Sequence, residues 1–244
     1  MKDLHCHILP GLDDGCVDIE ESIKILKEAE KAGVTDIMFT PHFHKLKGYT
    51  CDNEKKLEVF SNLEKRVKEE NINIKLYLGN EILIDPDMVG LITSGKVRTL
   101  NNQNYLLFEF DTKIEHYPGC EDVLYNLVLA GCTPIMAHPE RYKYFQKHPE
   151  AAEKYAKLGI LFQGNYKSLL GKYGRGSEKT LKTFLKKGLI TFLASDIHHE
   201  SNYDLEKAKK KVKSIVKDDS VIDDLFINNF DKVVNNEPIS MKRR

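Results

Sequence analysis

Short apolar runs and longer amphipathic stretches alternate along the whole chain. The apolar runs have the length of β-strands, and most are apolar at nearly every position, which is typical of parallel strands buried on both faces. Seven such runs are present: the run that carries Asp3, His5 and His7, then Val34–Thr40, Ile72–Gly79, Tyr105–Phe110, Pro134–Ala137, Ile160–Gln163 and Leu189–Ala194. The sequence therefore predicts seven strands.

The stretches between these runs space their apolar residues as an amphipathic helix does. Glycines follow several of them, where glycine commonly ends a helix, and Ser177 has the character of an N-cap. The predicted helices are Asp18–Ala32, Asn53–Glu70, Asp85–Ser94, Glu121–Ala130, Pro149–Leu158 and Ser177–Lys187, with two more after the last strand.

This alternation of strand and helix predicts a parallel sheet with helical crossovers. We expect a closed α/β arrangement of the (β/α) barrel type, with an open doubly wound sheet as the alternative. The first strand is not followed by a GxGxxG or P-loop pattern, which disfavours a nucleotide-binding open sheet. No repeat or linker divides the chain, so residues 1–244 are expected to form a single domain.

Composition narrows the functional classes. Lysine plus arginine and aspartate plus glutamate are balanced at 37 each, which disfavours nucleic-acid binding and attachment to a membrane surface. No segment is apolar enough to span a bilayer and no signal-peptide core is evident, so no membrane insertion and a cytoplasmic location are expected. The five cysteines lack CxxC spacing and fit reduced thiols.

Residues that could bind a metal ion are concentrated at the ends of the predicted strands. In α/β barrels the active site lies at the carboxyl ends of the strands. Six of the seven predicted strands end in or near metal-capable side chains, namely His5, His7, Asp14, His42, Glu81, Glu109, His138, Asp196 and His198. Nine imidazole and carboxylate ligands are too many for one ion, so the pattern predicts a cluster of two or three. Manganese, iron or zinc suits these ligands.

All of these residues except Glu109 lie in motifs that resemble those of the PHP (polymerase and histidinol phosphatase) superfamily. More narrowly, the chain resembles bacterial protein-tyrosine phosphatases of capsule and exopolysaccharide operons, from about residue 3 to the end. The motifs are Asp3-Leu4-His5-Cys6-His7, Asp13-Asp14-Gly15, Thr40-Pro41-His42, Gly79-Asn80-Glu81, Ala137-His138-Pro139-Glu140-Arg141 and Ser195-Asp196-Ile197-His198.

The resemblance implies a distorted seven-stranded barrel and a site for up to three ions, most often Mn²⁺, with iron, zinc or magnesium as alternatives. One ion would take His5, His7, Glu81 and Asp196; a second Glu81, Glu109 and His138; and a third Asp14, His42 and His198. Asp13 is the alternative to Asp14. The implied catalytic residues are Arg141, as the phosphate clamp, with His42 and His198. The implied substrate is phosphotyrosine on a bacterial tyrosine kinase, attacked by metal-bound hydroxide.

Several alternatives stay open at this point. A histidinol-phosphate type phosphomonoesterase would use the same metals, and a non-catalytic kinase-docking module would need no reaction. Cysteine-based tyrosine phosphatase chemistry is excluded, because no cysteine has an arginine six positions later. We further expect Pro139 to hold His138 in an extended conformation and Cys6 to be a packing residue. The glycine-rich loop at residues 170–176 is expected to be a plain connection, with contact of Lys172 or Arg175 to an anionic substrate as the alternative. His116 and His148 are expected to be surface residues. So are His44 and His199, although their places beside ligands leave a supporting role or a substrate contact as the alternative.

Overall fold

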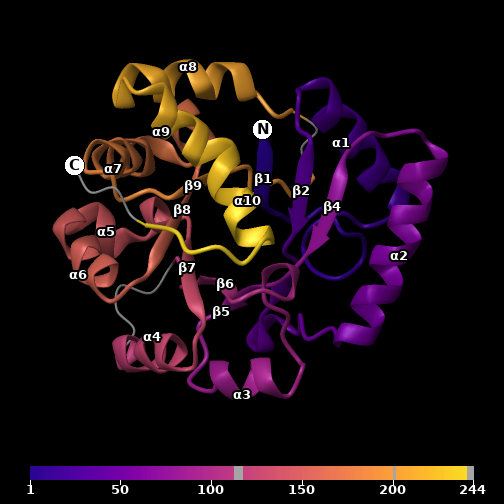
Figure 1. The fold of residues 1–244 in the computed structure, drawn as a ribbon, viewed down its shortest axis with the longest axis horizontal. Helices are drawn as coiled ribbons and strands as arrows, with labels where there is room; N and C mark the ends of the chain where they lie inside the picture. Colours follow the sequence, from indigo (N-terminus) through magenta and orange to yellow (C-terminus); the bar gives the residue numbers. More distant parts are fainter. Residues whose placement is uncertain (113–117, 200–201, 241–244) are drawn as a thin grey trace.

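The computed structural model describes residues 1–112, 118–199 and 202–240, and it shows a mixed α/β fold whose strands are all parallel within their sheets (Figure 1). The strands are β1 (Lys2–Cys6), β2 (Asp36–Phe39), β3 (His42–Phe43), β4 (Lys75–Leu78), β5 (Glu81–Leu83), β6 (Tyr105–Glu109), β7 (Thr133–Ala137), β8 (Leu161–Asn165) and β9 (Phe192–Ala194).

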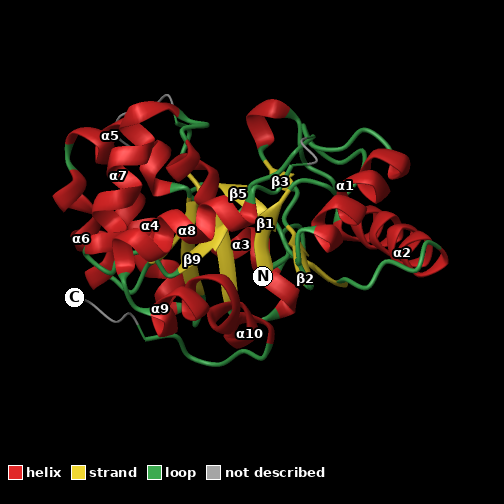
Figure 2. Ribbon diagram, turned by 90° about the horizontal axis from the view of Figure 1, so that it is seen from above, coloured by secondary structure: helices red, strands yellow, loops and turns green. Residues whose placement is uncertain are grey.

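Helices occupy the connections between the strands and surround the sheets (Figure 2). The α-helices are α1 (Ile19–Lys31), α2 (Asn53–Glu69), α3 (Met88–Thr93), α4 (Cys120–Leu129), α5 (Lys143–Lys147), α6 (Ala152–Lys157), α7 (Gly174–Lys186), α8 (Leu205–Val216), α9 (Asp219–Asp223) and α10 (Asn229–Val234). Within the described residues, no helix combines the length and apolar character needed to cross a membrane.

The strands form two sheets rather than one closed ring. One has the order β1-β2-β4 and the other the order β3-β5-β6-β7-β8-β9. The predicted strands Val34–Thr40 and Ile72–Gly79 end close to the ends of β2 and β4. Two further short strands, β3 and β5, follow them, so the described residues contain nine strands instead of seven. Pro41 lacks the N–H that a continuous ladder needs, and the side chain of Asn80 donates to its carbonyl oxygen at 2.8 Å.

The eight predicted helices lie close to observed ones, but the described residues contain ten α-helices, because α5 was not predicted and both α9 and α10 occupy the last predicted region. The clearest difference in position is at α7. That helix begins at Gly174, three residues before the predicted N-cap, and Ser177 is buried inside it. The serine hydroxyl accepts a hydrogen bond from the Gln146 side chain of α5 at 3.2 Å. Ser177 therefore links two helices rather than capping one.

The core consists of apolar side chains on both sides of the strands. Leu4, Cys6, Ile37, Leu107, Ile135 and Phe162 are all fully or almost fully buried. Cys6 is a packing residue, as expected, with its thiol 3.5 Å from the Met38 carbonyl oxygen. Buried polar side chains are concentrated beyond this apolar core, at the carboxyl ends of the strands.

Candidate metal centre

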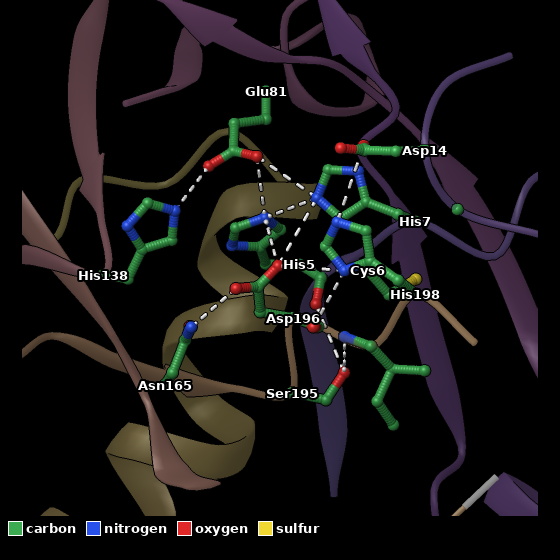
Figure 3. Close-up of polar contacts among 12 residues, drawn as sticks. His5, Cys6, His7, Asp14, Glu81, His138, Asn165, Ser195, Asp196 and His198 are labelled. Carbon is green, nitrogen blue, oxygen red and sulfur yellow. Dashed lines mark hydrogen bonds and ion pairs between the residues drawn. The ribbon is translucent and has the colours of Figure 1, made fainter. Parts of the chain in front are cut away.

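Glu81, the first residue of β5, lies at the centre of a buried polar cluster (Figure 3). Its Oε2 atom lies 3.1 Å from Nε2 of His5, 3.2 Å from Nε2 of His7 and 3.2 Å from Nδ1 of His42. Its Oε1 atom lies 3.0 Å from Nε2 of His138. One fully buried carboxylate thus contacts four imidazoles.

The remaining four predicted ligands surround this centre. Asp196 Oδ1 lies 3.5 Å from Nε2 of His5. Glu109 Oε1 lies 3.3 Å from Nδ1 of His42, and Asp14 Oδ1 lies 3.4 Å from Nε2 of the same ring. His198 Nε2 lies 3.8 Å from Asp14 Oδ1. The structure therefore brings all nine side chains together at the carboxyl ends of the strands.

The pair His5 and His7 shows that these side chains fit a cation. Their Nε2 atoms lie 3.0 Å apart, while Nδ1 of His5 faces Gln163 Oε1 at 2.7 Å and Nδ1 of His7 faces Asp13 Oδ2 at 2.7 Å. Because those oxygens accept the Nδ1 protons, both Nε2 atoms face the centre, where at most one proton fits between them. A metal ion in place of that proton would satisfy both nitrogens.

The electrostatics of the cluster point in the same direction. Burial, together with the neighbouring charge of His7, lowers the pKa of His42 to about 3 and that of His198 to about 4, so both are neutral at pH 7. Burial and the adjacent Glu81 raise the pKa of Glu109 well above its usual value. His42 Nδ1, Glu81 Oε2 and His138 Nδ1 are buried without a hydrogen-bond partner among the described residues. Bound cations would relieve these costs at His42, Glu81 and Glu109.

The structure separates the two adjacent carboxylates that the sequence could not. Asp13 is turned inward: its carboxylate contacts His7 Nδ1 and accepts hydrogen bonds from the backbone N–H groups of Gly15, at 2.9 Å, and His42, at 2.8 Å. Asp14 instead lines the open pocket. Asp13 therefore orients the histidines, and Asp14 is the better placed of the two to bind an ion.

Replacing Asp13 by asparagine should make the metal-free protein less stable, in a pH-dependent way. Although burial opposes it, the contacts with His7 and His42 lower the pKa of Asp13 from 3.8 to about 2. A lowered folded-state pKa stabilises the protein above the unfolded-state pKa, and this contribution disappears as the pH falls through the folded value. We expect a loss of about 2 kcal/mol at pH 7, shrinking below about 1 kcal/mol at pH 2, measured by urea unfolding. An equal loss at both pH values would contradict this account.

Gly15 lets the chain pass closely over His7. A Cβ atom at this position would lie 1.7 Å from the His7 carbonyl oxygen, so every other residue would clash with the backbone. The neighbouring Cys16 N–H donates to that same carbonyl oxygen at 3.1 Å. The Asp13-Asp14-Gly15 motif thus fixes both the loop and the strand that it covers.

Lys56 on α2 is a positioning residue that the sequence did not reveal. It is 1% exposed, and burial lowers its pKa to about 8. Its ammonium group donates to Asn80 Oδ1 at 2.6 Å, and the amide of Asn80 in turn holds the backbone at Pro41. Asn80 and Pro41 immediately precede Glu81 and His42. This network therefore fixes the backbone just before His42 and Glu81, whose side chains point into the centre.

Strand β8 supplies two further supporting residues. Gln163 and Asn165 alternate with Gly164, so both side chains point to the same face. Gln163 contacts His5, and the Asn165 amide donates to Asp196 Oδ2 at 2.7 Å (Figure 3). The only signal in the sequence is the polar character of these two positions at the end of an apolar run.

Arg141 faces the centre from the turn after β7. Its Nη1 atom donates to Asp196 Oδ2 at 2.8 Å, and its guanidinium carbon lies 4.4 Å from the centroid of the Tyr173 ring. Although burial opposes it, Asp196 raises the pKa of Arg141. The arginine is thus held between a carboxylate and an aromatic face.

The contact with Tyr173 corrects one expectation, since the loop at residues 170–176 borders the site rather than being a plain connection. The histidines outside the motifs differ from each other. His148 and His199 are on the surface, 56% and 50% exposed at their side chains, but His44 is buried and lines the pocket. His116 lies outside the described residues.

His138 also departs from expectation. Its backbone is in the left-handed region, at φ 35° and ψ 52°, instead of being extended before Pro139. The turn after β7 is closed by a hydrogen bond from the Arg141 N–H to the His138 carbonyl oxygen at 2.9 Å, which overrides the local preference. Asp196 has a positive φ of 50° as well. Two of the nine candidate ligands thus have strained backbones, as residues at functional sites often do.

The cluster opens into a cavity of about 220 Å³, large enough for a phosphate group and part of an aromatic ring. Its walls include Asp14, His42, Glu81, Arg141 and His198, with Lys47 at the rim. A parallel α/β fold that presents imidazoles, carboxylates and an arginine to one cavity is the arrangement of a metal-dependent hydrolase.

Comparison with known proteins agrees with this class. The family model described as capsular polysaccharide synthesis, CpsB/CapC, matches residues 1–235. The CapC protein of Staphylococcus aureus is 35% identical over 203 residues, which cover 83% of this chain and 78% of that protein. Tyrosine-protein phosphatase YwqE of Bacillus subtilis is 32% identical over 200 residues, which cover 82% of this chain and 78% of that protein. The chain belongs to the CpsB/CapC family.

Solved structures give the same result. A crystal structure from work on YwqE of Bacillus subtilis and CpsB of Streptococcus pneumoniae, described as unique metal-dependent tyrosine phosphatases, superposes with a TM-score of 0.90 at 28% identity. The match covers 100% of this chain and 97% of that one. Histidinol phosphate phosphatase of Lactococcus lactis matches at a TM-score of 0.55 and 14% identity, over 88% and 92% of the two chains. That second likeness shows a shared fold alone.

Proposed function

We propose that this protein is a metal-dependent protein-tyrosine phosphatase that acts on a bacterial tyrosine kinase controlling capsule or exopolysaccharide synthesis. The observation that carries the proposal is the convergence of eight imidazole and carboxylate side chains around Glu81, beneath a cavity that Arg141 also lines. The high structural similarity to the YwqE and CpsB phosphatases supports the choice of substrate.

The proposed ligands are those that the family resemblance implies. His5, His7, Glu81 and Asp196 would hold one ion; Glu81, Glu109 and His138 a second; and Asp14, His42 and His198 a third. Three overlapping groups, whose ligand atoms lie within 4.8 Å of one another, contain seven of these nine side chains: His7 with Asp14, His42 and His198; His5 and His7 with Glu81; and His42 with Glu81 and Glu109. His138 and Asp196 are outside these groups and contact them through Glu81 and His5. We propose manganese as the metal.

When bound, the ions would neutralise the phosphate and supply the hydroxide nucleophile. The protein side chains would do the rest of the work. Arg141 would bind phosphate oxygens through its planar guanidinium group, which Asp196 and Tyr173 already orient. His42 and His198 are neutral at pH 7, so they would act as nitrogen ligands and not as general acids. A tyrosyl leaving group, with a pKa of about 10, makes little demand on an acid.

The fold proposal is a distorted seven-stranded barrel in a single domain. Its support is the contact between the first and last strand regions, where the His7 N–H donates to the Ile197 carbonyl oxygen at 2.8 Å and the Asp196 N–H to the His5 carbonyl oxygen at 2.9 Å. β2 with β3, and β4 with β5, would then each count as one interrupted strand. A cytoplasmic location fits a substrate on an intracellular kinase domain.

Metal removal tests the proposed function. After chelation we expect phosphate release from a phosphotyrosine peptide to fall to background, and Mn²⁺ to restore it more fully than Zn²⁺, Fe²⁺ or Mg²⁺. Histidinol phosphate serves as the competing substrate. A preference for histidinol phosphate would assign the protein to small-molecule metabolism. No turnover of either substrate by the metal-loaded protein would favour the non-catalytic docking module.

A further inference from the structure

Positive charge is concentrated in one part of this electrically balanced chain. Residues 166–217 contain 13 lysines and arginines but five aspartates and glutamates, whereas the rest of the chain contains 24 and 32. Much of this charge lies on α7 and α8, which contact each other and occupy the flank of the molecule opposite α1 and α2 (Figures 1 and 2).

The cations of α7 and α8 form two rows that one carboxylate links. On α7, Arg175, Lys179 and Lys182 follow at spacings of four and three residues, which place them on one helix face. On α8, Lys207 and Lys211 are four residues apart. Glu178 joins the two rows, because its Oε1 lies 2.7 Å from Lys182 Nζ and 3.5 Å from Lys211 Nζ. We call these five cations the basic ribbon; four are exposed and Lys182 is half-buried.

The basic ribbon begins at the mouth of the proposed active site. Tyr173, which lies against Arg141, is two residues before Arg175, and the Lys172 ammonium is 5.2 Å from the centroid of the same ring. From Arg175 to Lys182 the helix rises about 10 Å, the length of about three residues of extended peptide. A chain with its phosphotyrosine beneath Arg141 would therefore reach Lys179 and Lys182 within a few residues.

We infer that the basic ribbon binds an acidic segment of the substrate polypeptide, close in sequence to the phosphotyrosine. This inference rests on the proposed function and adds the substrate class that the site selects. Charge complementarity favours a polyanionic partner, and continuity with the site favours one that is covalently linked to the phosphotyrosine. Exposed ion pairs are individually weak and are screened by salt. Together they should therefore make the protein prefer phosphotyrosine peptides with acidic flanks over those with neutral flanks, strongly at low salt and weakly at high salt.

The test compares two phosphotyrosine peptides, one flanked by glutamates and one by glutamines. We expect the wild-type, Mn²⁺-loaded protein to show about a tenfold higher kcat/KM for the acidic peptide at 20 mM NaCl, and nearly equal values at 500 mM. The variant Lys179→Glu/Lys182→Glu/Lys207→Glu should lose this preference yet hydrolyse p-nitrophenyl phosphate at the wild-type rate. The matched control Lys31→Glu/Lys65→Glu/Lys68→Glu changes the net charge equally on α1 and α2 and should keep the preference.

An unchanged preference in the basic-ribbon variant would overturn the inference. So would binding of wild-type protein, but not of this variant, to phosphatidylglycerol vesicles without any peptide preference, because the surface would then serve a membrane. Failure of the proposed function gives a different result, namely no hydrolysis of either peptide or of p-nitrophenyl phosphate by wild-type protein. Fluorescence anisotropy with the two labelled peptides would still test the basic ribbon in that case.

Discussion

Replacing Glu81 by glutamine is expected to lower metal-dependent phosphate release by about 10³-fold or more, which corresponds to about 4 kcal/mol of transition-state stabilisation. The substitution keeps the shape of the side chain but removes the negative charge that contacts His5, His7, His42 and His138. Since this carboxylate is the proposed bridge between two ions, both should bind more weakly. His138→Ala and Asp196→Ala should act in the same direction.

The measurement is kcat/KM on a phosphotyrosine peptide, together with metal content by mass spectrometry and folding by circular dichroism. Asp36→Asn is the matched control, because Asp36 is also a buried carboxylate but lies at the opposite end of the parallel strand region and pairs with Lys2. The control should retain activity. A folded Glu81→Gln protein with near-native turnover would show that the proposed metal centre is wrong.

Arg141→Ala is expected to lower kcat/KM by about 10² to 10³-fold while leaving the metal content unchanged. Hydrogen bonds to charged groups contribute about 1.5–3 kcal/mol each, and a guanidinium group can make two of them to a phosphate. Arg141→Lys should recover part of the loss, because an ammonium group keeps the charge but not the planar pair of donors. An Arg141→Ala variant within twofold of wild type would rule out the phosphate clamp.

Tyr173 provides an internal check on this interpretation. A guanidinium–aromatic contact contributes about 0.5–2 kcal/mol, so Tyr173→Leu should lower kcat/KM about 3- to 30-fold, mainly through a higher KM. Tyr173→Phe keeps the aromatic face and should behave like wild type. In the Arg141→Ala background, Tyr173→Leu should have no further effect, because the partner through which it acts is gone.

The strand-end pattern of ligands was predictable from the sequence because it depends on chain order and local periodicity. Parallel strands place their carboxyl ends at one edge, so His42, Glu81 and His138 were expected at the same edge once their strands were recognised. The polar residue Glu109 inside an apolar run was equally readable. These inferences need no knowledge of which strands are neighbours.

The supporting contacts were not predictable, because they join residues far apart in the chain. Lys56 reaches Asn80 across 24 residues, and Gln163 reaches His5 across 158. Nothing local distinguishes a lysine that orients a strand break from one on a solvated helix face. The contact of Tyr173 with Arg141 likewise joins a connecting loop to a distant turn.

The sequence by itself determined the α/β class, the order of the elements and the identity of the nine converging side chains. Only the tertiary structure decided how they are held: Asp13 turned toward His7 while Asp14 faces the cavity, His138 in a left-handed conformation, and two additional short strands that begin directly after Pro41 and Asn80. The physical reason is that local periodicity specifies which face a side chain occupies, whereas orientation depends on hydrogen-bond partners that only folding brings within reach.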